Sequence, residues 1–155
     1  EPLLSVLRER RDSGGQVYIA GNGGSAANAS HAATHLRECG IKAICLNDSA
    51  SHVTAIGNDF GYEHIFTKSI AAEHLHKDDL VIVFSCSGRS PNILNLLKLA
   101  RGCGAASAGI LGFNGGTAIE FCDTVLRFNS DNYGALEDAH SAVIHVVKET
   151  LIQFP

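Results

Sequence analysis

The chain of 155 residues is poor in charge and has no long hydrophobic run. Charged residues make up 18% and hydrophobic residues 45%, whereas soluble domains usually carry roughly 25% charge. This composition can bury a core and excludes a disordered chain. No apolar run reaches the roughly 20 residues of a membrane-spanning helix. Basic residues are not in excess, because 12 Lys and Arg stand against 16 Asp and Glu, a net charge of −4. We therefore expect neither a membrane nor a nucleic-acid partner.

Methionine, paired cysteines and a secretory signal are also absent. The sequence contains no Met and begins at Glu1, so we expect further residues before it and a shortened N-terminal helical segment. The five cysteines include no C-x-x-C pair, and an odd, scattered set is typical of reduced thiols. Without a secretory signal, the sequence predicts a cytoplasmic protein.

Short β-branched runs alternate with longer helix-compatible segments, which is typical of an α/β domain with a parallel sheet. The predicted strands are residues 16–20, 42–46, 80–85, 106–112 and 124–128. The predicted helices are residues 2–11, 26–38, 65–75, 91–102, 117–121 and 136–154. The strands are apolar on both faces, so helices should cover both sides. We predict one domain over residues 1–155, with a three-layer, doubly wound sheet of five mainly parallel strands and helices on both faces.

The first candidate ligand site is the segment Gly21-Asn22-Gly23-Gly24-Ser25-Ala26, between a strand and a helix. Its glycines let the backbone approach a ligand, and the helix N-terminus adds partial positive charge. The spacing also fits the dinucleotide pattern G-x-G-x-x-G/A, which requires an acidic residue about 20 positions later. The nearest candidate, Asp48, lies 48 − 21 = 27 positions after Gly21. We therefore expect no nucleotide cofactor.

The second candidate site is Ser85-Cys86-Ser87-Gly88-Arg89-Ser90-Pro91-Asn92, again between a strand and a helix. Ser90 and Pro91 suit the start of that helix. Three serines beside a helix N-terminus can donate several hydrogen bonds to one phosphate. Such loops also occur as plain turns, but two in one small sheet favour a ligand site, and the serines favour a phosphosugar.

Three motifs carry a resemblance to a known family. They are Gly21-Asn22-Gly23-Gly24-Ser25-Ala26-Ala27, Gly57-Asn58-Asp59-Phe60-Gly61 and Ser85-x-Ser87-Gly88-x-Ser90-x-Asn92. Together they resemble the sugar isomerase (SIS) domain, most closely its phosphoheptose isomerase branch, over residues 17–152. The resemblance implies a flavodoxin-like SIS fold. It also implies isomerisation of sedoheptulose 7-phosphate to D-glycero-D-manno-heptose 7-phosphate through an enediol(ate), for lipopolysaccharide or other surface-glycan synthesis.

The expected substrate-binding residues follow from these loops and from the resemblance. The residues are Asn22, Gly23, Gly24, Ser25, Asn58, Asp59, Ser85, Cys86, Ser87, Ser90 and Glu137. In the family the serines hold the phosphate, and Asn58 and Asp59 occupy positions that contact the sugar hydroxyls. Without the resemblance, Gly57-Asn58-Asp59 is equally well explained as a turn.

Histidines are the candidate proton carriers, because imidazole titrates near neutral pH. His31 and His35 are four residues apart and should share one helix face, as should Glu137 and His145 two turns apart. The resemblance makes His145 and position 35 the catalytic acid/base groups. The family has Glu where this chain has His35, and Gln where it has Glu137. His140 also matches a family histidine, for which we expect only a structural role.

Some family members bind zinc at the same positions, so the candidate metal ligands are His31, His35, Glu137 and His145. Three imidazoles and a carboxylate suit zinc. Glu137 and His145 are separated by about 12 Å along a helix axis, so ligands from two subunits would be needed for one ion. The resemblance implies a homotetramer with its sites at subunit contacts.

Two alternatives remain open from the sequence. One is a non-catalytic SIS module that binds a phosphosugar or a protein, as replication-initiator-binding members do. The changes at His35 and Glu137 favour it, whereas His31 and His145 oppose it. The other is a fragment of a dinucleotide-binding oxidoreductase.

Overall fold

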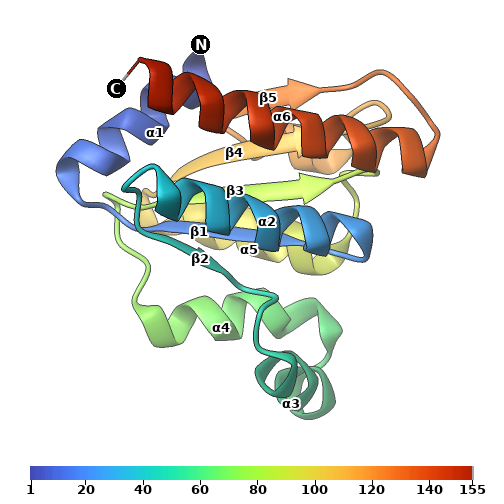
Figure 1. Cartoon of the computed structure of the whole chain (residues 1–155). Helices are drawn as coiled ribbons and strands as arrows, with labels where there is room; N and C mark the ends of the chain where they lie inside the picture. The colour runs from blue at the N-terminus through green and yellow to red at the C-terminus, as the bar shows by residue number, and fades with distance from the viewer. Residues whose placement is uncertain (155) are drawn as a thin grey trace.

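The computed structural model describes residues 1–154 and contains one parallel sheet with the strand order β2-β1-β3-β4-β5 (Figure 1). The strands are β1 (Val17–Gly21), β2 (Ala43–Cys45), β3 (Leu80–Ser85), β4 (Ala106–Leu111) and β5 (Thr124–Arg127). All four neighbouring pairs are parallel. This confirms the predicted α/β fold with its flavodoxin-like order. The order in which the strands are added reverses between β1 and β3, because β2 lies on one side of β1 and β3 to β5 lie on the other. Such folds bind ligands at this point.

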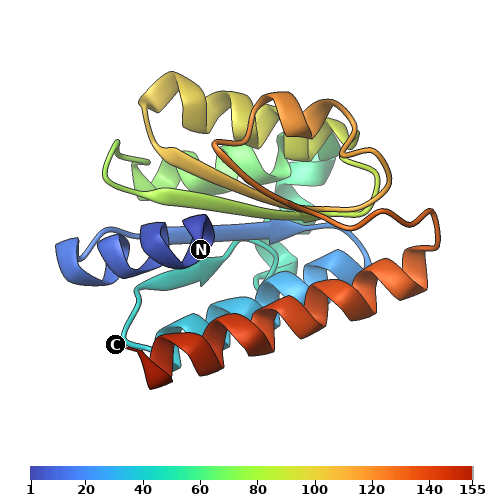
Figure 2. The same cartoon turned by 90° about the horizontal axis from the view of Figure 1, so that it is seen from above.

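Helices cover both faces of the sheet, as Figure 2 shows from above. One face carries α1 (Pro2–Ser13), α2 (Gly24–Glu38) and α6 (Tyr133–Gln153), and the other carries α3 (Ala50–Phe60), α4 (Ile65–Glu73) and α5 (Pro91–Cys103). Two short 3₁₀ helices, η1 (Tyr62–His64) and η2 (Thr117–Glu120), lie in the connections. The arrangement confirms the predicted three layers.

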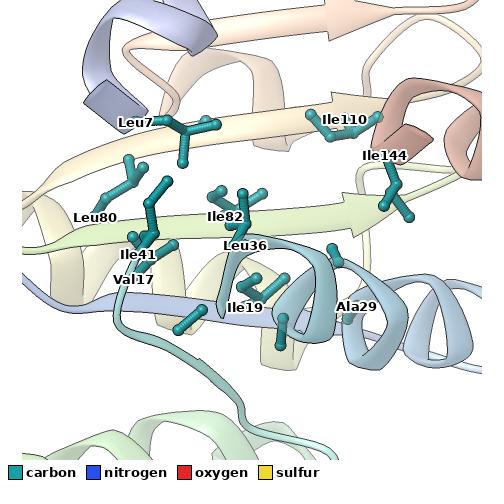
Figure 3. Close-up of a cluster of buried hydrophobic side chains, with 14 of the residues drawn as sticks. Leu7, Val17, Ile19, Ala29, Leu36, Ile41, Leu80, Ile82, Ile110 and Ile144 are labelled. Atoms are coloured by element: carbon teal, nitrogen blue, oxygen red, sulfur yellow. The ribbon is translucent and has the colours of Figure 1, made fainter. Parts of the chain in front are cut away.

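Two hydrophobic clusters hold the layers together. Figure 3 shows the first, where Leu36 of α2 and Ile144 of α6 pack on Ile19 and Ile82 of the central strands. Every residue of β1 and β3 is buried, which explains why these strands are apolar on both faces. Truncating a side chain such as Ile19 would cost about 2–5 kcal/mol. The ends of these strands are therefore firm supports for the loops that follow them.

The predicted elements differ from the structure mainly between β2 and α4. Helix α3 was not predicted, because its sequence mixes β-branched residues with Gly57. Ser49 caps it by accepting a hydrogen bond from the backbone amide of His52 at 3.3 Å. The predicted helix at 117–121 is the 3₁₀ turn η2. Within residues 1–154, none of the helices combines the length and the apolar character that crossing a membrane requires.

Candidate active site

A cavity of about 110 Å³ lies at the carboxyl ends of β1 and β3. We call it the serine pocket. It is lined by Asn22, Ser25, Phe84, Ser85, Cys86, Ser87, Ser90, Tyr133 and Glu137. Two loops that are far apart in the sequence thus meet at one site, together with the start of α6. The pocket lies where the strand order reverses, between β1 and β3, and both predicted strand–loop–helix segments contribute to it.

The serine hydroxyls surround the N-terminus of α5. Ser85 Oγ accepts a hydrogen bond from the Gly88 amide at 3.0 Å, and Ser87 Oγ accepts one from the Arg89 amide at 3.3 Å. Ser90 is the N-cap residue of α5 by position, but its side chain forms no capping hydrogen bond. The hydroxyl protons therefore remain available to donate to an anion, in addition to the partial positive charge of the helix end.

Glycine is required in the loop between β3 and α5, which carries Ser87 and Ser90 and which we call the serine loop. Gly88 has φ +63°, and a Cβ there would lie 1.9 Å from the Gly115 carbonyl oxygen. The Ala118 amide donates to the Gly88 carbonyl at 2.9 Å, so the loop after β4 supports the serine loop from behind. Any larger residue at 88 would displace one loop or the other.

Two asparagine side chains join the two loops. Asn22 Nδ2 donates to Asn92 Oδ1 at 2.9 Å, and Asn92 Nδ2 donates to Asn22 Oδ1 at 2.8 Å. The Tyr62 hydroxyl also donates to Asn22 Oδ1 at 3.1 Å. Asn92 is buried, with 1% of its surface exposed. Neither Asn92 nor Tyr62 was predicted to have a role, and the only sequence signal for Asn92 was its place at the end of the motif Ser85-x-Ser87-Gly88-x-Ser90-x-Asn92.

Glu137 lies in the serine pocket against the first turn of α2. A Cβ on Gly24 would come within 2.2 Å of the Glu137 carboxyl carbon, so the glycine makes room for this carboxylate. Asn28 Nδ2 donates to the Glu137 backbone oxygen at 2.9 Å and fixes α6 against α2. The amino end of a helix favours a negative charge at this place.

Three histidines converge between α2 and α6, and we call them the histidine cluster. The ring centroids of His31 and His35 lie 4.3 Å apart, and those of His145 lie 5.1 Å from His31 and 5.5 Å from His35. One ligand nitrogen from each lies within 4.8 Å of the others. Among the residues described, this converging set holds three of the four predicted zinc ligands and not Glu137. Eight residues along a helix correspond to about 12 Å, which explains the separation.

The electrostatic surroundings of His31 favour its neutral form. Partial burial lowers the pKa of His31, the nearby His35, His145 and Lys148 lower it further, and Glu38 opposes them. His35 Nε2 is buried and has no hydrogen-bond partner among the described residues. Neutral imidazoles with a free nitrogen are what a metal ion needs, so this cluster could hold one.

Asn58 and Asp59 lie in the last turn of α3 and not in a loop, which corrects the turn that the sequence also allowed. Both side chains are exposed, and Asn58 Nδ2 donates to Asp59 Oδ1 at 2.9 Å. Neither residue lines the serine pocket of its own chain.

The remaining histidine of α6, His140, is fully buried. Its ring packs 5.9 Å from both Phe84 and Phe128, measured between centroids. Burial lowers its pKa, against a smaller opposing effect of the Leu111 backbone. Its surroundings are those of a core residue.

Comparison with known proteins agrees with the fold. The SIS domain profile matches residues 4–112, which defines the class of the domain. The phosphoheptose isomerase of Trichlorobacter lovleyi is 38% identical over 97% of this chain and 80% of its own length. That of Burkholderia pseudomallei is 39% identical over 95% and 81%. The solved phosphoheptose isomerase of Neisseria gonorrhoeae superposes with a TM-score of 0.92 at 27% identity, covering 97% of this chain and 83% of that one. This chain belongs to the phosphoheptose isomerase family of SIS domains.

Proposed function

We propose that this protein is an aldose–ketose isomerase that converts sedoheptulose 7-phosphate to D-glycero-D-manno-heptose 7-phosphate through an enediol(ate). The observation that carries the proposal is the convergence of three imidazoles on α2 and α6, the same helices whose ends border the serine pocket. The family relationship supports the substrate, since its relatives are phosphoheptose isomerases. A domain that only bound a sugar phosphate would not need grouped proton carriers.

The serine pocket is the proposed site of the phosphate. Ser85, Ser87 and Ser90 donate hydroxyl hydrogen bonds to its oxygens, and the N-terminus of α5 adds partial positive charge. The backbone of residues 22–24 lines the rest of the substrate, with the side chains of Ser25 and Cys86 beside it. Holding the phosphate orients the sugar, and this positioning lowers the barrier for proton transfer.

The histidine cluster is the proposed site of proton transfer. The reaction moves one proton between two adjacent carbons and another between their oxygens, and each transfer needs an acid/base group. We assign these roles to His145 and His35. His145 is exposed, so it can reach a substrate. Glu137 would accept hydrogen bonds from sugar hydroxyls in the pocket.

Zinc fits the residues of the cluster. His31, His35 and His145 supply imidazole nitrogens, and the unpartnered Nε2 of His35 gains a partner on binding. Bound zinc would polarise the substrate carbonyl and stabilise the enediolate oxygen. Glu137 could join these ligands only from another subunit, since in its own chain it lies in the serine pocket.

The proposed assembly is a homotetramer of single SIS domains with sites at the subunit contacts. Exposed apolar side chains on and after α6 support an interface there, including Val146, Ile152 and Phe154, which are 53–64% exposed. All five cysteines are free, which supports a cytoplasmic site of action. The product would then be used for surface-glycan heptose.

Proton exchange in heavy water tests the proposal. The protein is incubated with sedoheptulose 7-phosphate, with and without added zinc, and deuterium is measured at the carbon next to the carbonyl. We expect incorporation by the wild type and its loss in His145→Ala. Binding of the sugar phosphate without any exchange would contradict the isomerase assignment and favour a regulatory binding module.

A further inference from the structure

The two ring nitrogens of His35 lie in different surroundings. Nδ1 lies 3.1 Å from Glu38 Oε2, whereas Nε2 is buried and unpartnered among the described residues. We propose that Glu38 is a positioning residue that keeps the proton of His35 on Nδ1, leaves Nε2 with a free lone pair for a metal ion, and is itself held by Lys148. The inference rests on the proposed function only because the histidine cluster is the proposed metal and proton-transfer site.

The hydrogen-bond chemistry fixes the direction of this contact. A carboxylate only accepts, so His35 Nδ1 must be the donor, and in a neutral imidazole the other nitrogen then carries the lone pair. A buried acceptor without a partner is costly, so the free Nε2 is maintained by the surrounding structure and not by its own interactions.

Lys148 explains how the carboxylate is held. Its Nζ lies 2.5 Å from Glu38 Oε2, the same oxygen that receives the His35 proton. Glu38 is the last residue of α2, and Lys148 lies on α6, so the ion pair joins the two helices that carry the histidine cluster. Cys39 Sγ donates to the Lys148 backbone oxygen at 3.9 Å, a second link at the same crossing. The Glu38 carboxylate is thereby held beside Nδ1 of His35.

The arrangement has a known use in metal sites. Histidine ligands commonly donate their second N–H to a carboxylate, which fixes the tautomer and the orientation of the ring. In this chain the carboxylate is that of Glu38, three residues after His35, and it acts through the His35 ring.

Metal affinity is the first test, measured on the full chain with Zn²⁺ alone and with Co²⁺ alone as a coloured probe. Glu38→Ala should weaken Zn²⁺ binding by about 10- to 100-fold, the usual effect of removing such a carboxylate. Glu38→Gln should retain most of the affinity, because its side-chain carbonyl can still accept from Nδ1. Lys148→Met should give an intermediate loss. Glu149→Ala, which removes an exposed neighbouring carboxylate, is the matched control and should bind as the wild type does.

The histidine tautomer is the second test and needs no metal or substrate. In ¹⁵N-labelled, metal-free protein at a pH where the ring is neutral, His35 should carry its proton on Nδ1, and Glu38→Ala should shift the population towards the Nε2-protonated form. Equal Zn²⁺ affinity in Glu38→Ala and Glu149→Ala would overturn the inference, as would an Nε2-protonated His35 in the wild type. A wild type that binds metal no better than His145→Ala would do the same. A failure of proton exchange with sedoheptulose 7-phosphate, with these results intact, would instead remove only the proposed function.

Discussion

The serine pocket and the histidine cluster are built in different ways. The pocket is made largely of loops after β1 and β3, and glycines such as Gly88 let neighbouring backbone segments pack closely. The cluster is made of side chains alone, presented by two helices that pack on one another. A phosphate needs many fixed donors, whereas proton transfer and metal binding need a few groups that can change state. The difference indicates that binding and chemistry can be disrupted separately.

His145→Ala should give the largest difference between the loss of exchange rate and the loss of substrate binding. Loss of an acid/base group should lower the exchange rate by about 10²- to 10⁴-fold. Binding of sedoheptulose 7-phosphate, measured by calorimetry, should change much less, since the serine pocket is untouched. His52→Ala, which removes an exposed histidine of α3, is the control and should keep full activity. An equal loss of binding and rate in His145→Ala would contradict the assignment of binding to the serine pocket and of proton transfer to the histidine cluster.

The reverse experiment is Ser90→Ala. Its hydroxyl is not used in capping α5, so its removal should leave the fold intact and cost one hydrogen bond to a charged ligand. We expect inorganic phosphate to bind about 10-fold more weakly, as measured by calorimetry. Ser5→Ala, an exposed position on α1, should bind phosphate as the wild type does. Unchanged binding in Ser90→Ala would place the phosphate elsewhere.

The same contrast decides what could be predicted from sequence. The five strands and the convergence of both loops followed from local patterns, because parallel strands bring their carboxyl ends to one edge. The flavodoxin-like order of the strands was implied by the family resemblance. His31 and His35 followed from helix periodicity. Their meeting with His145 was inferred from the family, since residues more than 100 positions apart are joined only by the packing of α6 on α2. The contacts of Asn92, Tyr62 and Glu38 depend on such packing, and no local sequence pattern predicts them.

A smaller effect on phosphate binding is expected from a substitution of Glu137 in the serine pocket. Its carboxylate lines the pocket that we assign to a dianion, so Glu137→Gln removes a repulsive charge. We expect inorganic phosphate to bind several-fold more tightly, with an effect that fades at high salt. Asp138→Asn removes an exposed neighbouring charge and should change phosphate binding less. Weaker phosphate binding in Glu137→Gln would show that the carboxylate organises the pocket instead.

The smallest predicted effect concerns pH and the buried His140. Its pKa is lowered in the folded state, so below about pH 6.5 the unfolded chain binds a proton that the folded chain does not. The free energy of unfolding should therefore fall as the pH drops, by at most about 1.4 kcal/mol per pH unit from this group. Urea denaturation of the wild type and His140→Leu between pH 7.5 and 5.5 measures it, and the variant should show a shallower decline. Parallel curves would assign the dependence to other groups, among them His31.

The reciprocal amide pair of Asn22 and Asn92 has a consequence for how the chain folds. The pair can form only when β1 and β3 are aligned with Gly21 opposite Phe84. A slip by one residue would displace one amide by about 3.3 Å relative to the other, which would break both hydrogen bonds. The pair therefore forms only in the native register of the two strands. Phosphate binding during refolding would accordingly detect molecules in which the central strands are correctly paired, and not molecules that have merely collapsed.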